Sequence, residues 1–588
     1  MNSEFSFASR NQSIERFAAE TFDFLVVGGG ITGAAVARDA ASRGLKVALI
    51  EKHDFASGTS SASSKLVHGG LRYLENFEFK LVFESLSERA HLIRTQPNMV
   101  RWLKFYLPVY QSDARGKNLI SLGLWLYDLL SLFRAPHFHR RLSKSEISKE
   151  LPSLKKEGLV GGFTYYDASM WDDVMCVENA RAASELGAAV VTRFEAISPL
   201  WKDGMIRGLE CRDVESGHSH TVRAHHTVIC VGPYTDLMGD LLLQGAPVAE
   251  KKQFIDPQGK WMPWLKPSRG THLVFAKERF PVPGALLLSN EEDGRISFVI
   301  PREDFGSGVV IVGTTDGPSP NDPDAVLAEG EDILYLLRLL KRYFPELKLT
   351  EADIISRYVG VRPLMDPEFG SHAGGGGAAL SKVSREHHIG PGPGHTTFVA
   401  GGKYTTHRTM ALEIVDHALE SWREDFWQDR AARVPAWHQA QTEGPMSSAV
   451  TREAIDGFRA EVEEARRLGL GAAEVASINA LIERYGADAR TVLELHAQFS
   501  ESRPSPAGLP YLESQLRYAI RFEMVLGLDD FYFRRLPLYL GRQDHARDWI
   551  PSLSRVWAEE RGFAEPERVR AVEKLERQIL ARDSGHRT

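Results

Sequence analysis

The chain has 588 residues, 43% of them hydrophobic and 25% charged, which is the composition of an ordinary globular protein of several domains. Its formal net charge of −7 gives no reason to expect binding to nucleic acid. The three cysteines, Cys176, Cys211 and Cys230, are too few for a disulfide framework and lack a metal-ligand spacing, so we expect a reducing compartment and no metal.

The first segment, residues 1–20, is polar and mixed in charge and lacks the apolar core of a signal peptide. No later stretch reaches the roughly 18 consecutive apolar residues of a membrane-spanning helix. We therefore expect a cytoplasmic protein.

Residues 22–51 predict a strand, a glycine-rich turn, a helix and a second strand. Phe22–Val27 is an apolar run of strand length, Ala34–Ser42 has helical composition, and Lys46–Ile50 is a second apolar run. Between the first strand and the helix stand the glycines of a G-x-G-x-x-G spacing: Gly28, Gly30 and Gly33.

This unit has the arrangement that binds the pyrophosphate of a dinucleotide. The first glycine permits a tight turn, the second lets the pyrophosphate approach the backbone, and the third lets helix and strand pack closely. The helix N-terminus then faces the phosphates, with Ile31 and Thr32 beside them. Glu51 ends the second strand, where an acid accepts hydrogen bonds from a ribose, and Lys52 follows it. The alternative is a purely structural turn.

The loop at residues 57–75 is dense in hydroxyl side chains and glycine and poor in core residues. Next to a dinucleotide site it supplies many small hydrogen-bond donors, so we expect it to belong to the site. Its expected cofactor contacts are Ser60, Ser61, Ser63, Ser64, His68, Gly69 and Gly70.

A predicted amphipathic helix, Glu78–Thr95, is followed by a mostly helical stretch that Pro108 and Pro136 interrupt. Leu119–Phe133 is the most apolar part and has basic flanks. It fits a buried core helix or an amphipathic element in a membrane interface. Residues 251–266, where two tryptophans stand among lysines, fit either a lipid headgroup boundary or an ordinary surface loop.

The middle of the chain alternates between strand and helix signals. A strand at 222–231 runs into Gly232, which suits a second cofactor contact in the same parallel sheet. Short apolar runs between 269 and 315 suggest an antiparallel sheet. The other predicted elements are strands near 161–166, 188–192 and 354–361 and helices at 172–186 and 325–344.

A third strand–glycine–helix unit appears near residue 400. The strand Thr397–Ala400 meets two glycines, and a helix begins near Thr405. A cofactor domain assembled from such distant segments favours FAD over NAD, and a helix N-terminus stabilises the negative charge of reduced flavin. The expected contacts are Gly401, Gly402, Lys403, Thr405 and Thr406.

Residues 447–588 are rich in alanine, glutamate, arginine and leucine and predict a separate helical domain, with helices near 450–468, 472–486 and 509–527. Within it, Asp529 and Asp530 lie at helical spacing from Arg534 and Arg535, which favours structural salt bridges.

Four separated motifs occur in an order that resembles FAD-dependent glycerol-3-phosphate dehydrogenases. They are SSASSKLVHGGLRYLE, IVGTTD, GVRPL and AGGKYTTHR. The resemblance implies oxidation of sn-glycerol 3-phosphate to dihydroxyacetone phosphate, with electrons passed to ubiquinone or menaquinone from the inner face of the cell membrane, where the protein is peripheral. It also implies a glycine-oxidase-like flavoprotein fold.

The expected fold class is therefore α/β: a Rossmann-like FAD-binding domain built from discontinuous segments, an antiparallel-sheet substrate domain, and an all-α C-terminal cap domain. The FAD-binding domain takes residues 20–75, 164–240 and 396–428. The remaining segments are a substrate or membrane-facing part at 76–163, the substrate domain at 241–395, and the helical domain at 437–588.

Carried over by position, the resemblance assigns a substrate pocket and catalytic residues. Arg72 and Tyr73 belong to the pocket, His272 lies near the reacting carbon, Arg362 is an active-site arginine, Arg385 grips the phosphate, and Lys403 lies near flavin and substrate. The catalytic set is His272, Arg362 and Lys403. A glycine-rich insertion at 370–377 departs from the family pattern and makes Arg385 the least secure.

Residue chemistry supports this assignment. A phosphate monoester favours arginine forks. Oxidation of a secondary alcohol transfers a hydride to flavin N5 and a proton to a base, for which a pKa near neutrality is best, so His272 is the expected base. The paired histidines at 225–226 and 387–388 lack supporting metal ligands.

Three other functions stay open: a glycerol-3-phosphate oxidase that reduces oxygen, a flavin oxidase of another small hydroxy or amino acid, and a non-catalytic flavoprotein whose helical domain docks a partner. The oligomeric state is also open, with a homodimer among the alternatives.

Overall fold

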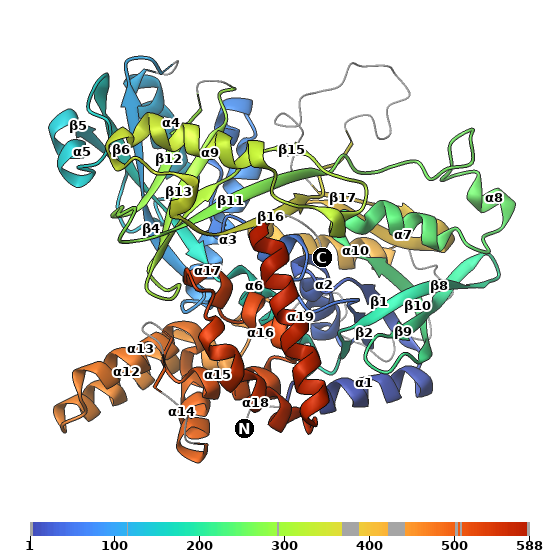
Figure 1. Ribbon diagram of the computed structural model, residues 1–588. Coiled ribbons are helices and arrows are strands. Elements are labelled where there is room, and N and C mark those ends of the chain that lie inside the picture. The colour runs from blue at the N-terminus through green and yellow to red at the C-terminus, as the bar shows by residue number, and fades with distance from the viewer. Residues whose placement is uncertain are drawn as a thin grey trace.

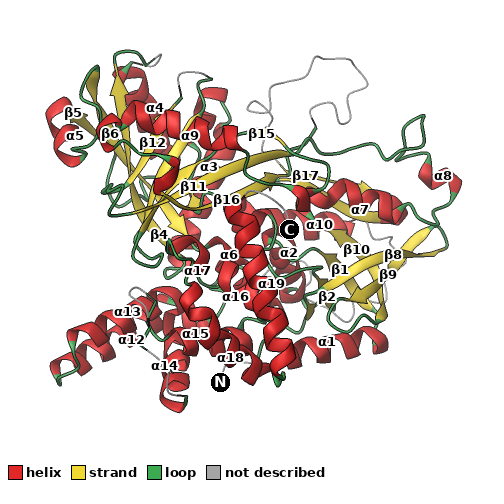
Figure 2. Ribbon diagram, viewed as in Figure 1, coloured by secondary structure: helices red, strands yellow, loops and turns green. Residues whose placement is uncertain are grey.

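The computed structural model describes residues 4–113, 116–290, 293–366, 387–420, 442–499, 502, 504–505 and 509–584. Two sheets lie side by side, with a group of helices from the C-terminal part of the chain beneath them (Figure 1). The helices that cover the sheets and those of the C-terminal part stand out in Figure 2.

The first sheet is parallel at its centre and is built from distant segments of the chain. Its central strand pairs in parallel with neighbours on both sides, and its residues are buried without alternation, as expected when helices cover both faces. From edge to edge the order is β17 (His387–Gly392), β18 (Thr396–Gly401), β10 (Ser219–Ile229), β1 (Phe22–Val27), β2 (Val47–Ile50) and β7 (Ala189–Val191). An antiparallel ribbon of β8 (Phe194–Lys202) and β9 (Met205–Asp213) extends from β10.

Helix α2 (Ile31–Ser42) follows β1 directly and is almost entirely buried. It packs between α6 (Asp172–Glu185) and α10 (His407–Glu420), which come from distant parts of the chain. The strand–turn–helix units predicted near residues 22, 222 and 397 therefore converge on one sheet.

The second sheet is mostly antiparallel. Its order is β15 (Gly317–Pro318), β11 (Ser268–Ala276), β14 (Val309–Gly313), β13 (Ile296–Arg302), β12 (Ala285–Ser289), β4 (Val100–Tyr110), β6 (Leu159–Met170) and β3 (Leu66–Val67). Strand β16 (Ile354–Arg362) pairs with β11, and β5 (Arg140–Ser143) with β6. Helix α9 (Gly330–Tyr343) packs its apolar side onto β11.

The C-terminal part is all helical, as predicted. Its longer helices are α12 (Arg452–Arg467), α13 (Ala472–Tyr485), α14 (Ala489–Gln498), α15 (Leu512–Phe522), α18 (Ile550–Arg561) and α19 (Glu565–Ser584). Between α15 and α18, α16 (Leu528–Arg534) carries the acidic and basic residues noted in the sequence, and Arg534 pairs with Asp530 at 2.8 Å. The α/β fold class with a helical C-terminal domain is confirmed.

Three sequence expectations differ from the structure. The stretch after Pro97 is not mostly helical, because Val100–Tyr110 forms β4 and pairs with β6 along its length; aromatic and β-branched residues favour this pairing. Trp261 and Trp264 do not stand at a surface boundary, since they are 5% and 4% exposed in the core under the first sheet.

The third difference concerns α4 (Lys117–Leu130), which is not a buried core helix. Its apolar side chains Leu119, Leu122, Trp125 and Leu129 are between 53% and 67% exposed. Only Leu124, Tyr127 and Asp128 of this helix are buried. Across the described ranges, none of the helices combines the length and the hydropathy needed to cross a membrane.

Candidate functional site

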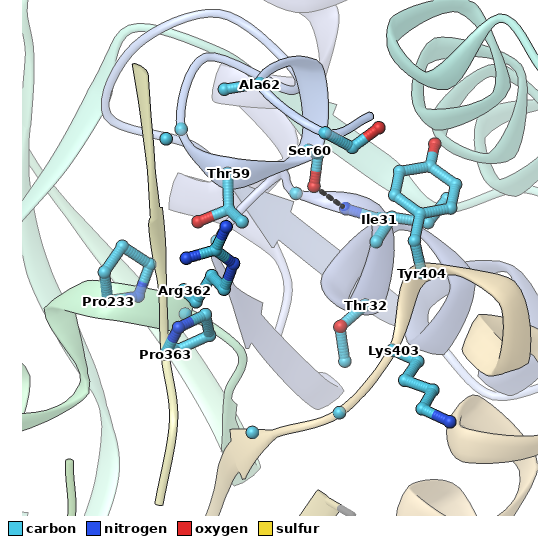
Figure 3. A pocket seen from close by; sticks show the side chains of 18 of the residues that line it. Ile31, Thr32, Thr59, Ser60, Ala62, Pro233, Arg362, Pro363, Lys403 and Tyr404 are labelled. Carbon is cyan, nitrogen blue, oxygen red and sulfur yellow. Dashed lines mark hydrogen bonds between the residues drawn. The ribbon is translucent and has the colours of Figure 1, made fainter. Parts of the chain in front are cut away.

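A cavity of about 580 Å³ opens between the carboxyl ends of the first sheet and strands β11 and β16 of the second. Figure 3 shows residues that line it, among them Arg362 from β16 and Lys403 from the segment after β18. Most of the residues predicted to contact the cofactor line it: Gly28, Gly30, Ile31, Thr32, Glu51, Lys52, Ser60, Ser63, Ser64, His68, Gly70, Gly232, Gly401, Gly402, Lys403 and Thr405.

At one end of the cavity the glycine turn leaves no room for side chains. Gly28 has a φ of +106°, and a Cβ at Gly33 would lie 1.9 Å from the carbonyl oxygen of Gly28. Gly33 therefore packs the helix against the turn rather than lining the cavity. Ser60 Oγ accepts a hydrogen bond of 2.9 Å from the backbone N–H of Ile31 at the start of α2 (Figure 3).

Glu51 closes this end of the cavity. Its carboxylate accepts hydrogen bonds from the backbone N–H groups of Gly29 at 2.6 Å and His53 at 2.8 Å. Burial raises the pKa of Glu51, and the two N–H donors oppose that shift. Lys52, the next residue, lies 3.0 Å from Asp324 and 4.0 Å from the centre of the Tyr234 ring.

At the other end, His272 of β11 is 3% exposed and held on several sides. Its ring stacks on Tyr358 with centroids 4.6 Å apart, and Nε2 lies 2.9 Å from Ser64 Oγ. Opposite it in the sheet stands Gly313, where a Cβ would lie 2.2 Å from His272 Cδ2. Glycine is needed there to leave space for the imidazole.

The pKa of His272 is lowered to about 3, first by burial and then by the positive charges of Arg362 and Lys65. This value is far below the near-neutral pKa expected from the sequence. The reason lies in the tertiary structure. The sheet removes the imidazole from water, and two cations from other segments disfavour a positive charge on the imidazole. His272 is therefore neutral at physiological pH.

Arg362 ends β16 opposite Ser268 of β11, and its guanidinium is held by groups of the second sheet. Nη2 donates to Thr314 Oγ1 at 2.7 Å and to the Thr315 carbonyl at 3.0 Å, and Nη1 lies 3.4 Å from Asp316. A Cβ at Gly270 would lie 2.2 Å from Nη2, so the fork crosses β11 where the strand carries no side chain.

Lys403 reaches the cavity from two glycines with positive φ, +74° at Gly401 and +96° at Gly402. Its ammonium lies 3.7 Å from the centre of the Tyr73 ring. Tyr73 belongs to the turn Leu71–Asn76, and its ring covers Gly70, where a Cβ would lie 2.1 Å from the ring. The lysine predicted to lie near flavin and substrate thus meets the tyrosine predicted for the substrate pocket.

The serine-rich loop is held by hydrogen bonds to residues that were not predicted from the sequence. Asp172, at the start of α6, accepts hydrogen bonds of 2.6 Å from both Ser63 Oγ and Lys65 Nζ, and it is fully buried. Tyr358 donates to the Ser63 carbonyl at 2.9 Å. In the sequence, the only indication of this role is the position of Asp172 between a predicted strand and the start of a predicted helix.

Some predicted site residues lie elsewhere. Ser61, Gly69 and Thr406 do not line the cavity: the Ser61 carbonyl accepts from Lys65 Nζ, the Gly69 N–H donates to Tyr127, and Thr406 is buried in the turn before α10. The side chain of Arg72, all of Arg385 and the glycine-rich stretch 370–377 fall outside the described residues.

The cavity suits a long, anionic ligand with chemically different ends, such as FAD. One end is a glycine turn at the N-terminus of α2, where added Cβ atoms would meet backbone, and a buried acid stands beside it. The other end carries His272, Arg362 and Lys403, and the third glycine turn, Gly401 and Gly402, lines the same cavity. Within the described residues, no group of histidine, cysteine, aspartate or glutamate side chains is arranged to hold a metal ion.

The family described as "FAD dependent oxidoreductase" matches residues 23–408, and the family described as "C-terminal domain of alpha-glycerophosphate oxidase" matches residues 445–568. These two matches correspond to the sheets and to the C-terminal helices.

Individual proteins match over nearly the whole chain. The chain is 32% identical over 517 residues to a protein named aerobic glycerol-3-phosphate dehydrogenase of Staphylococcus haemolyticus, covering 88% of this chain and 86% of that one. The protein of the same name from Staphylococcus saprophyticus is 30% identical, with 98% of both chains covered. The solved structure of the glycerol-3-phosphate dehydrogenase from Bacillus halodurans complexed with FAD has a TM-score of 0.75 and 27% identity, again covering 98% of each chain.

Proposed function

Because this chain belongs to the FAD dependent oxidoreductase family and binds FAD, we propose that it oxidises sn-glycerol 3-phosphate to dihydroxyacetone phosphate. The observation that carries the proposal is the convergence of His272, Arg362 and Lys403 at one end of the cavity whose other end is the glycine turn. The names of the relatives, which cover almost the whole chain, support the substrate.

Substrate recognition in this proposal depends on cations. The phosphate of the substrate carries nearly two negative charges, and an arginine fork binds such a group with two parallel hydrogen bonds. Arg362 and Lys403 bring positive charge to the cavity, with Arg72 and Arg385 proposed as further contacts. Tyr73, over which Lys403 lies, is proposed to close the pocket beside them.

His272 is proposed as the group that takes the hydroxyl proton. At physiological pH its imidazole is neutral, so one ring nitrogen carries a lone pair that can take that proton. A bound phosphate dianion adds negative charge near His272, which raises its pKa and strengthens it as a base in the complex. When bound, FAD supplies the acceptor for the hydride that leaves carbon.

Anaerobic titration tests this function. Addition of glycerol 3-phosphate to the oxidised holoenzyme is expected to bleach the flavin absorbance near its visible maximum, whereas glycerol and lactate at the same concentration leave it unchanged. Bleaching by lactate or by an amino acid would instead support a flavin oxidase of another substrate. No bleaching by any of these compounds would support a non-catalytic flavoprotein.

For the electron acceptor we propose a membrane quinone, with the protein bound peripherally to the inner face of the cell membrane. An apolar surface supports this: the exposed side chains of α4 continue into Leu132, Phe133 and Phe138, which are between 50% and 59% exposed. Exposed basic residues follow it in sequence, namely Arg134, Arg140, Arg141 and Lys144. Apolar side chains beside cations suit the boundary of an anionic bilayer.

A substitution within this surface separates membrane binding from folding. Leu122→Asp is expected to weaken binding to vesicles that contain anionic lipid by roughly tenfold, since a buried leucine contributes about 1.5–3 kcal/mol. Leu468→Asp is the matched control, because Leu468 is 81% exposed at the end of α12, away from this surface. Equal binding of both variants would contradict a lipid-facing role, and rapid oxygen consumption with slow quinone reduction would favour the oxidase.

A further inference from the structure

The turn after β2 connects the cofactor cavity with the helical C-terminal domain. Its first residues, Glu51, Lys52 and His53, line the cavity. Asp54 comes next, does not line the cavity, and is 2% exposed. One short turn therefore has one side in the cavity and the other buried against another domain.

Two consecutive arginines of the helical domain hold Asp54. Arg534 Nε lies 2.6 Å from Oδ2, and Arg535 binds both carboxylate oxygens through Nη1 and Nη2 at 2.9 and 2.8 Å. Arg535 is fully buried, so these charge-assisted bonds are shielded from water. Removal of one partner from such a pair leaves buried charge without compensation.

The backbone of the same turn is held a second time. The N–H of Arg193 donates to the His53 carbonyl at 2.8 Å, while the guanidinium of Arg193 lies 2.9 Å from Asp530 of the helical domain. Asp530 also binds Arg534 at 2.8 Å. The contacts from both sides thus belong to one buried network.

The N-terminal segment closes the third side. Phe55 stacks on Phe5 with ring centres 5.8 Å apart. The backbone of Phe5 bonds to the helical domain twice, from its N–H to the Arg521 carbonyl at 3.1 Å and from the Met524 N–H to its carbonyl at 2.7 Å. Phe55 is therefore packed against a segment that the helical domain itself holds.

A displacement of this turn would reach the glycine loop directly. Glu51 accepts from the N–H of Gly29, and the N–H of Ala56 donates to the Gly29 carbonyl at 3.2 Å. We propose that the helical C-terminal domain keeps FAD bound by holding the turn 51–56 in place, with Asp54, Arg534 and Arg535 as positioning residues. The inference rests on FAD binding in this cavity and is independent of the substrate.

The test measures FAD release rather than turnover. Asp54→Asn in the full-length holoenzyme is expected to release FAD about tenfold faster on dilution, because its charge-assisted bonds are lost; flavin fluorescence follows the release. Asp488→Asn is the matched control: Asp488 is a buried carboxylate at the same domain interface, 2.9 Å from Arg181, but does not contact the turn. It is expected to lower the Tm without faster release.

Equal release rates in the two variants, or a rate unchanged by Asp54→Asn, would overturn the proposal. If Asp54→Asn does not fold, Arg535→Lys replaces it, since lysine keeps the charge but loses the two-point contact. The increase in the rate of FAD release is then expected to be smaller than with Asp54→Asn, and the control should show no increase. A protein that binds FAD but does not oxidise glycerol 3-phosphate would leave this test valid.

Discussion

The two ends of the cavity are built on different principles. The glycine end comes from one continuous segment, residues 28–60, and offers backbone N–H groups in a turn with no space for a Cβ. The other end, which we propose is the catalytic end, combines side chains from β11, β16 and the segment after β18, which are far apart in the chain. The first end is thus sensitive to added atoms, and the second to lost functional groups.

The largest effect is expected from adding one methyl group at the glycine end. Gly33→Ala places a Cβ 1.9 Å from the Gly28 carbonyl, a backbone contact that no rotamer relieves. We expect the free energy of unfolding to fall by more than about 3 kcal/mol. The protein should be purified without FAD, which its absorbance spectrum would show. Gly457→Ala, in an open part of α12, is the control and should retain FAD. A yellow Gly33→Ala protein would show that this turn tolerates an added methyl group.

At the catalytic end, His272→Asn is expected to keep FAD while slowing anaerobic flavin reduction on the order of 10²–10⁴-fold, the usual contribution of a general base. His226→Asn is the control, because His226 is an equally buried histidine that bonds Thr397 in the first sheet, away from the cavity. If His272→Asn loses FAD, or if both variants slow reduction equally, His272 is structural.

A smaller effect is expected from Arg362→Lys, which keeps a charge but loses the fork. Hydrogen bonds to a charged group contribute about 1.5–3 kcal/mol, so the KM for glycerol 3-phosphate should rise roughly 10–100-fold. Arg295→Lys serves as control, since Arg295 donates to the Asp316 carbonyl at 2.7 Å without lining the cavity. An unchanged KM for Arg362→Lys would remove this arginine from phosphate recognition.

The last effect concerns pH. The pKa of His272 is about 3 in the folded protein and about 6.5 when unfolded, so the unfolded chain binds the extra proton between these values. The contribution of His272 to stability is therefore complete above pH 6.5 and is lost as the pH falls towards 3. Urea unfolding from pH 7 to pH 4 should show a shallower loss of stability for His272→Asn than for the unsubstituted protein. Parallel curves would contradict the buried, neutral imidazole.

Much of the fold was predictable from local patterns. The strand Phe22–Val27 has the predicted bounds, and the later strand–glycine–helix units are also present. They could be predicted because buried parallel strands appear in a sequence as apolar runs, here followed by glycine. Strand β4 was not predicted, since its partner β6 comes from a segment about 50 to 70 residues away in the chain. The exposed face of α4 was left open, because hydropathy alone does not distinguish a buried helix from a helix with an exposed apolar face.

The candidate site divides in the same way. Gly28, Gly33 and Glu51 were predictable, because the spacing of a turn and the acid beyond it are local properties of the chain. Asp172 and Tyr358 were not, since they act on the serine-rich loop across large separations in sequence. The role of Asp54 was also hidden, because its two arginines follow some 480 residues later.

The glycine turns and the alternation of strands and helices follow from spacing along the chain, and the available cationic and imidazole side chains follow from its composition. The contacts between distant segments bury His272 and keep it neutral, place Lys403 on Tyr73, and let the helical domain hold Asp54. Burial and the distance between charges are set by which segments meet, and a pKa or a buried ion pair depends on both.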